Sequence, residues 1–174
     1  MKRYLMLLFV LCFTASVNAN ITHFGADQVI GQNKLGEPVF RSTTTPTIVT
    51  FWASWCVYCK QLLPLLEGLQ RKLTNNRIRV IVVNTKEEGK LGQTRRTYKK
   101  LLRQFEQRGM QVEFVFDKKG VLYKKFKKPG LPFTMVIEKN GQISYTQAGF
   151  SERLAQPMLD AIQRALDKNT PDKI

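Results

Sequence analysis

A run of β-branched and aromatic residues leads directly into two closely spaced cysteines. Thr47 to Ala53 reads Thr-Ile-Val-Thr-Phe-Trp-Ala, which is typical of a strand buried on both faces. Leucines then recur at helical spacing, so we predict a helix from Val57 to Leu73 with a kink at Pro64. Cys56 is therefore placed where a buried strand gives way to a helix, and Cys59 follows about one turn later.

Downstream of this helix, apolar runs alternate with turn residues and amphipathic segments. Their order predicts an α/β fold in which a central mixed β-sheet is flanked by helices on both faces. In chain order, we expect an edge strand at 38–41, strands at 77–84 and 112–117 separated by a basic helix at 89–108, a short amphipathic turn at 121–126, a hairpin of 133–138 and 142–147, and a helix at 152–166.

The first nineteen residues have the layout of a cleavable secretory signal. Two cations precede an apolar run from Tyr4 to Phe13, and small residues end the segment at Ala19. The apolar run is about half of the ~20 residues that span a bilayer, which favours cleavage after Ala19 over a retained anchor. We therefore expect residues 20–174 to form one domain that is located outside the cytoplasm, with its core over about 36–168.

Cysteine usage narrows the chemistry further. The chain has three cysteines, and Cys12 would leave with the signal. A disulfide between Cys56 and Cys59 closes too short a loop to add much stability, so redox chemistry explains the pair better than a structural role does. Half of a zinc site is the alternative, but structural zinc takes four ligands and the mature chain adds only His23. We expect no metal and no organic cofactor, and a surface position for His23.

The predicted position of Cys56 favours its thiolate form. Unpaired N–H groups and the positive end of the helix dipole stabilise an anion there. The pKa of thiols in such positions falls from about 8.5 to between about 3.5 and 7.5. Cys56 would then attack a substrate disulfide, and Cys59 would resolve the mixed disulfide. The same steps in reverse oxidise a dithiol, so the motif leaves the direction open.

The segment from Phe51 to Lys60, with Pro64 after it, resembles the active-site segment of thioredoxins, especially the bacterial periplasmic TlpA/ResA-like thiol-disulfide oxidoreductases. The resemblance implies a thioredoxin-like fold, protein disulfides or dithiols as substrates, and a membrane thiol relay as a possible electron donor. Further matches run in order across about Thr47 to Gly149, at Val83-Asn84, Phe116-Asp117 with Gly120, Gly130-Leu131-Pro132-Phe133-Thr134 and Glu138-Lys139-Asn140-Gly141.

The resemblance also assigns substrate-binding residues. It implies a cis peptide bond between Leu131 and Pro132, placed beside the cysteines, where neighbouring backbone groups can pair with an extended substrate. An ordinary turn before a strand is the alternative for Pro132. Trp55 would form one wall of the substrate-facing surface rather than fill the core.

Two departures from the family pattern affect the proton acceptor and the redox poise. Thioredoxins proper have a buried Asp where this chain has Thr50, and the resemblance to ResA-like proteins assigns the acid to Glu87, which would take the proton of Cys59. A solvated loop containing Glu87 and Glu88 is the alternative. Tyr58 stands where the reductases usually have Pro, and residues between the cysteines tune redox poise.

The chain is strongly basic, with a net charge of +15, or +13 from 26 cations and 13 acids without residues 1–19. Such a charge favours acidic partners or anionic membranes, and the secretory signal argues against nucleic acid as a physiological target. The cations form two clusters. The first is Lys118, Lys119, Lys124, Lys125, Lys127 and Lys128, and the second is Arg95, Arg96, Lys99, Lys100 and Arg103. We expect the first cluster to lie near Cys56 and to steer acidic substrates, with a solvated face as the alternative.

These features favour a monomeric periplasmic disulfide reductase whose catalytic residues are Cys56, Cys59 and Glu87. One alternative is a disulfide oxidase or isomerase of the same fold. Another is a non-catalytic thioredoxin-like module that binds an acidic partner through its lysines. The motif by itself does not identify the substrate protein.

Overall fold

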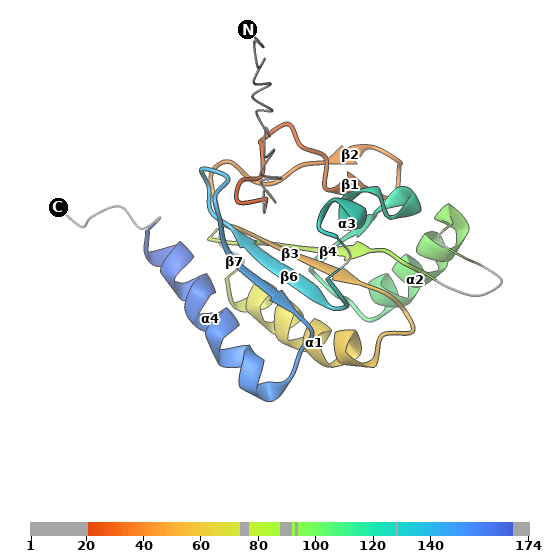
Figure 1. The fold of residues 1–174 in the computed structure, drawn as a ribbon. Coiled ribbons are helices and arrows are strands. Elements are labelled where there is room, and N and C mark those ends of the chain that lie inside the picture. The colour runs from red at the N-terminus through yellow and green to blue at the C-terminus, as the bar shows by residue number, and fades with distance from the viewer. Residues whose placement is uncertain (1–20, 74–76, 88–91, 93, 128, 169–174) are drawn as a thin grey trace, which may run out of the picture.

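The computed structural model describes residues 21–73, 77–87, 92, 94–127 and 129–168, so the expected signal sequence lies outside the described part. Within these ranges the chain forms one mixed sheet with helices on both sides (Figure 1). The elements are β1 (Gly31–Gln32), β2 (Pro38–Val39), β3 (Thr47–Trp52), α1 (Val57–Lys72), β4 (Arg79–Asn84), α2 (Arg95–Gln107), β5 (Glu113–Phe116), the 3-10 turn η1 (Lys118–Gly120), α3 (Val121–Lys125), β6 (Phe133–Ile137), β7 (Ile143–Ala148) and α4 (Glu152–Asp167).

The sheet order is β2-β1-β5-β4-β3-β6-β7, so β3 lies between β4 and β6. Strands β3, β4 and β5 are parallel, whereas β6 pairs with β3 and with β7 in antiparallel register. All six residues of β3 are buried, as its continuous β-branched and aromatic run predicts. The predicted α/β fold with a mixed sheet is therefore confirmed.

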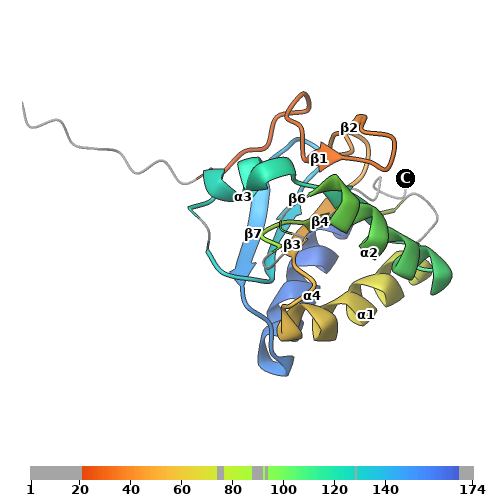
Figure 2. The same ribbon diagram turned by 90° about the vertical axis from the view of Figure 1, so that its right-hand side faces the viewer.

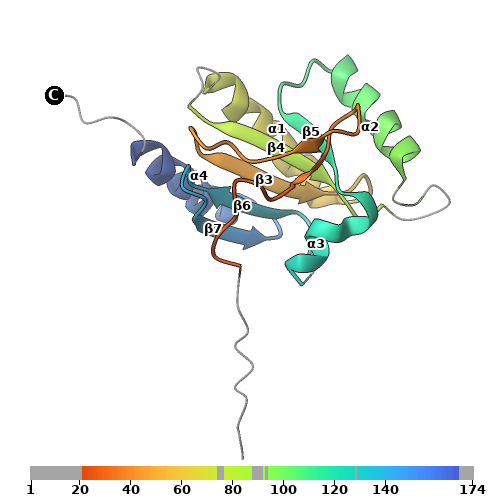
Figure 3. The ribbon, with the colours of Figure 1, turned by 90° about the horizontal axis from the view of Figure 1, so that it is seen from above.

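Two apolar cores lie on the two faces of the sheet. The first packs residues of α1, α2 and α4 around one face, including Leu66, Phe105 and Ile162. The second packs the N-terminal segment and α3 against the other, including Phe24 and Leu122. Figures 1 and 2 show α1 and α4 on one side and α3 on the other, and Figure 3 shows the N-terminal segment crossing the sheet from above.

Several element boundaries differ from the sequence-based prediction. The basic helix begins at Arg95, where the Thr94 hydroxyl accepts the Thr97 N–H at 3.1 Å and caps it, and residues 88–91 and 93 lie outside the described ranges. The edge strand ends at Val39, because the Phe40 carbonyl accepts a hydrogen bond from Arg79 at 2.7 Å. The two-residue strand β1 was not predicted.

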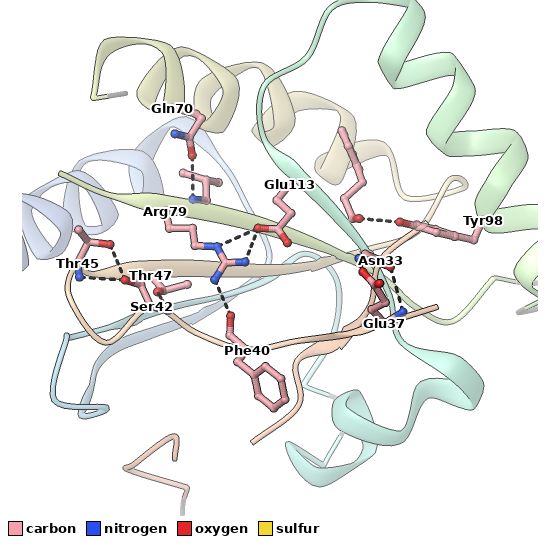
Figure 4. A network of polar contacts seen from close by, with 12 residues as sticks. Asn33, Glu37, Phe40, Ser42, Thr45, Thr47, Gln70, Arg79, Tyr98 and Glu113 are labelled. Carbon is pink, nitrogen blue, oxygen red and sulfur yellow. Dashed lines mark hydrogen bonds and ion pairs between the residues drawn. The ribbon is translucent and has the colours of Figure 1, made fainter. Parts of the chain in front are cut away.

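A polar network fixes the end of the sheet opposite the cysteines (Figure 4). Arg79, at the start of β4, donates to Glu113 on β5 at 2.9 and 2.6 Å, and Gln70 on α1 accepts the Val80 N–H at 2.9 Å. The buried Tyr98 hydroxyl donates to the Phe114 carbonyl at 2.6 Å, which joins α2 to β5. These bonds hold the starts of the parallel strands, so their carboxyl ends are positioned together at the other edge.

Across the described ranges, every helix is too short or too polar to cross a bilayer.

Candidate active site

The two cysteines form a disulfide at the start of α1, with their Cα atoms 5.2 Å apart. Cys56 is the N-cap residue in an extended conformation, and its Sγ accepts the Cys59 N–H at 3.1 Å. The exposed fraction of Cys56 is 4% and that of Cys59 is 1%, so Cys56 is the more accessible. The predicted junction of strand and helix therefore lies at the cysteine pair, with a backbone donor aimed at the first sulfur.

Exposed apolar side chains flank the disulfide. Trp55, Val57 and Tyr58 are 43%, 62% and 57% exposed, although they adjoin buried cysteines. The Trp55 indole is held in place, because its Nε1–H donates to the Lys86 carbonyl at 2.8 Å and the Lys86 ammonium lies 5.6 Å from the ring centroid. An ordered aromatic surface thus stands beside Cys56.

Glu87 is buried beneath the loop that precedes Cys56, so the solvated-loop alternative is wrong for this residue. One carboxylate oxygen accepts the Ser54 N–H at 2.7 Å and the other accepts the Ser54 hydroxyl at 2.6 Å. The Asn84 amide donates to the first oxygen at 2.6 Å. Lys86 before it has a positive φ of 51°, an uncommon conformation outside glycine that lets the chain turn here. Glu88 lies outside the described residues.

The position that carries an acid in thioredoxins proper is neutral here. Thr50 and Thr134 are both buried on the paired strands β3 and β6, and their hydroxyl oxygens lie 3.1 Å apart. One hydroxyl donates to the other, so the pair fills the site without a titratable group.

The Leu131–Pro132 peptide bond is cis, as the resemblance implied. The pairing of Phe51 with Phe133, continued by one residue, brings Pro132 opposite Trp52 at the end of β3. The Pro132 carbonyl accepts the Gly149 N–H at 2.7 Å, and the half-buried Leu131 packs against the core cluster that contains both cysteines. Pro132 therefore lies at the edge of the sheet from which the cysteine loop starts.

Asp117 is a second buried carboxylate at this edge, and the sequence had not suggested a role for it. Its oxygens accept the N–H groups of Leu122 and Tyr123, both at 3.0 Å, and the Thr85 hydroxyl at 3.2 Å. Burial raises the pKa of Asp117, while these hydrogen bonds act in the opposite direction. The only available signal was an Asp directly after a strand and before a short helix, which is typical of a cap.

The two basic clusters lie on different layers. Lys118 and Lys119 are in η1, and Lys124 and Lys125 are exposed on α3, which covers one face of the sheet. The cations of α2 belong to the layer on the other face. Lys128 lies outside the described residues, and steering by the first cluster stays a prediction. His23 is exposed, as expected. Wherever side chains are described, no three His, Cys, Asp or Glu residues gather as a metal site would require.

The chain is similar in sequence to known thiol-disulfide oxidoreductases. A family model described as thioredoxin-like matches residues 44–143. Sporulation thiol-disulfide oxidoreductase A of Bacillus subtilis (strain 168) is 25% identical over 103 residues, which is 59% of this chain and 59% of that protein. Thiol-disulfide oxidoreductase ResA of Geobacillus kaustophilus (strain HTA426) is 23% identical over 101 residues, or 58% of this chain and 53% of the relative. The chain thus spans little more than half the length of these relatives.

Solved structures agree on the fold. A Chlorobium tepidum protein named as a thiol:disulfide interchange protein DsbE superposes with a TM-score of 0.68 at 23% identity, over 85% of this chain and 99% of that one. StoA from Bacillus subtilis gives a TM-score of 0.55 at 21% identity, over 79% of this chain and 98% of StoA.

Proposed function

Because the chain belongs to the thioredoxin-like family, we propose that it is a periplasmic thiol-disulfide oxidoreductase that reduces disulfides in proteins. The observation that carries the proposal is the Cys59 N–H, which donates to Cys56 Sγ at the N-terminus of α1. The same donor and the helix dipole stabilise a Cys56 thiolate once the disulfide is reduced.

The proposed cycle starts from the dithiol form. The Cys56 thiolate attacks one sulfur of a substrate disulfide, the substrate S–S bond breaks, and the first substrate thiolate leaves. Cys59 then loses its proton and attacks Cys56 Sγ, which releases the second substrate thiolate. The substrate gains two electrons, the protein is left with the Cys56–Cys59 disulfide, and an external dithiol must reduce it again. A membrane thiol relay is the donor we expect.

Glu87 is the proposed acceptor of the Cys59 proton. Its burial beside the cysteine loop and its bonds to Ser54 support this assignment, because Ser54 stands two residues before Cys56. A carboxylate fixed at such a position can take a proton without reorganising. If the rate at which Cys59 resolves the mixed disulfide has the same pH dependence in Glu87→Gln as in the unaltered protein, Glu87 is not the proton acceptor.

Trp55, Leu131 and Pro132 are proposed to position the substrate. Trp55 offers a fixed, exposed ring beside Cys56, and Leu131 stands next to the cis proline at the edge of the sheet. An extended segment around the substrate cysteine would lie between them, with its backbone paired to the groups beside Pro132. We propose that residues 20–174 act as one monomeric domain.

The test is capture of mixed disulfides on Cys59→Ser, with Cys56→Ser as the matched control. Cys59→Ser should accumulate covalent adducts with substrate proteins and Cys56→Ser should not, because only the former retains the attacking thiolate. Equal reduction of a model disulfide by Cys56→Ser and the unaltered protein would refute the assignment of the nucleophile.

The direction of electron flow is tested separately by the reduction potential of the pair. A value near about −270 mV, as in thioredoxin, fits a reductase, whereas one near about −120 mV would assign an oxidase. Tyr58 is the feature that favours testing the oxidase alternative, because it stands between the cysteines where the reductases usually have Pro. If the Cys56→Ser, Cys59→Ser double variant retains full biological effect, the chain is a binding module instead.

A further inference from the structure

The exposed face of α2 carries an excess of cations that the fold does not use. Among its residues are five Lys and Arg, namely Arg95, Arg96, Lys99, Lys100 and Arg103, against the single acid Glu106. Glu106 pairs with Lys34 on the β1–β2 turn. Arg95 donates to the Lys34 carbonyl at 2.8 Å, whereas the other four cations form no ion pair within the described parts of the chain.

This arrangement works against helix stability. Arg95 and Arg96 occupy the first turn, where the helix dipole is positive, and no acid stands there to offset them. Arg96 with Lys100, and Lys99 with Arg103, form like-charge pairs at a spacing of four residues, which destabilise a helix. Because these cations destabilise the helix that carries them, a ligand outside the fold explains them better than the stability of the fold does.

The shape of the face favours a diffuse anionic surface over a protein partner. The cationic side chains surround an open groove of about 560 Å³. None of the large apolar side chains that are exposed lies on α2, so the helix itself offers none of the aromatic or aliphatic anchors that protein interfaces use. Leu35, on the turn that Arg95 holds, is 72% exposed and can enter a headgroup layer.

We propose that the α2 face, defined as Arg96, Lys99, Lys100 and Arg103 together with Leu35 on the turn that Arg95 holds, docks on a bilayer rich in anionic phospholipids. Each cation near such a surface strengthens binding by about fivefold, so four together supply several hundredfold. The α2 face lies on the layer opposite α3 and contains none of the proposed catalytic residues, so the inference does not rest on the redox function.

Sedimentation with vesicles tests the proposal. The full mature chain should bind vesicles of phosphatidylcholine with phosphatidylglycerol, and not vesicles of phosphatidylcholine alone. Raising salt from about 0.1 M to about 1 M shortens the Debye length from about 10 Å to about 3 Å and should release it. Arg96→Gln, Lys99→Gln, Lys100→Gln and Arg103→Gln combined should lower the partition coefficient by about a hundredfold or more.

The matched control removes the same charge from the other layer, with Gln at Lys118, Lys119, Lys124 and Lys125. This variant should keep most of its vesicle binding, and Leu35→Ser should lose part of it. Equal losses in the two four-charge variants would overturn the proposal, because binding would then follow net charge alone. Binding to polyglutamate but not to the anionic vesicles would overturn it in favour of an acidic protein. Thermal melting of each variant shows that the fold is retained.

Discussion

Removing the Glu87 carboxylate should destabilise the loop that presents Cys56. In Glu87→Ala, Ser54 loses the acceptors of its N–H and its hydroxyl, and Asn84 loses the acceptor of its amide. The two bonds from Ser54 join the loop before α1 to the loop after β4, alongside the bond from the Trp55 Nε1–H to the Lys86 carbonyl, and the Asn84 bond fixes the carboxylate to the end of β4. The substitution therefore tests whether the acid holds the catalytic loop in place.

The magnitude follows from burial. The Asn84 side chain is fully buried, so depriving its amide of this acceptor costs about 1–3 kcal/mol. Ser54 is only half-buried and its two donors can turn to water, which leaves about 1 kcal/mol for each bond. We expect Glu87→Ala to lower the free energy of unfolding by about 3–5 kcal/mol in total.

Urea unfolding of the disulfide form measures this change while keeping the cysteines bonded. Ser54→Ala, which removes only the hydroxyl donor, should cost about 1 kcal/mol. Glu37→Ala is the matched control, because Glu37 accepts a hydrogen bond from Asn33 at an exposed site, and its loss should stay within about 0.5 kcal/mol. If Glu87→Ala costs no more than Glu37→Ala, the carboxylate does not hold the loop.

Three further substitutions test the fold and its charges. Burial raises the pKa of Tyr98 to about 12, so its hydroxyl keeps its proton and donates to the Phe114 carbonyl. Tyr98→Phe removes this donor and should lower the free energy of unfolding by about 1–3 kcal/mol. An unchanged melting temperature would contradict this expectation. Burial raises the pKa of Asp117 above 3.8, so the folded state binds the Asp117 proton more tightly than the unfolded state does. Proton binding by Asp117 therefore stabilises the fold most below pH 3.8, and this stabilisation is lost as pH rises through the raised pKa. Urea titrations should show that the free energy of unfolding of the unaltered protein increases relative to that of Asp117→Asn as pH falls. Arg96→Glu places an acid in the first turn of α2, so it should raise the free energy of unfolding by about 0.5–1 kcal/mol, and the melting temperature with it, while weakening vesicle binding. No gain in stability would refute the electrostatic account of this helix.

Local patterns were enough to predict much of the fold. The continuous β-branched run of β3 records burial on both faces, and the leucine spacing of α1 records one buried face with a period of 3.6 residues, so both elements and the cysteine pair between them could be located. Family resemblance supplied the cis bond at Pro132 and the choice of Glu87. Helix ends were less predictable: α2 begins at a threonine cap, although the basic pattern extends further towards the N-terminus.

The polar partners at the site were decided by the tertiary structure. Ser54 and Glu87 are separated by 33 residues, and Thr50 and Thr134 by 84, so no local pattern records that each pair meets. Periodicity reports which side of an element is buried, but strand order and register determine which buried hydroxyl or carboxylate faces which. The sequence by itself therefore determined where the cysteines lie, at the start of a helix after a buried strand. Only the fold determined that Thr50 pairs with Thr134, and that Glu87 holds the cysteine loop from the loop that follows the neighbouring strand β4.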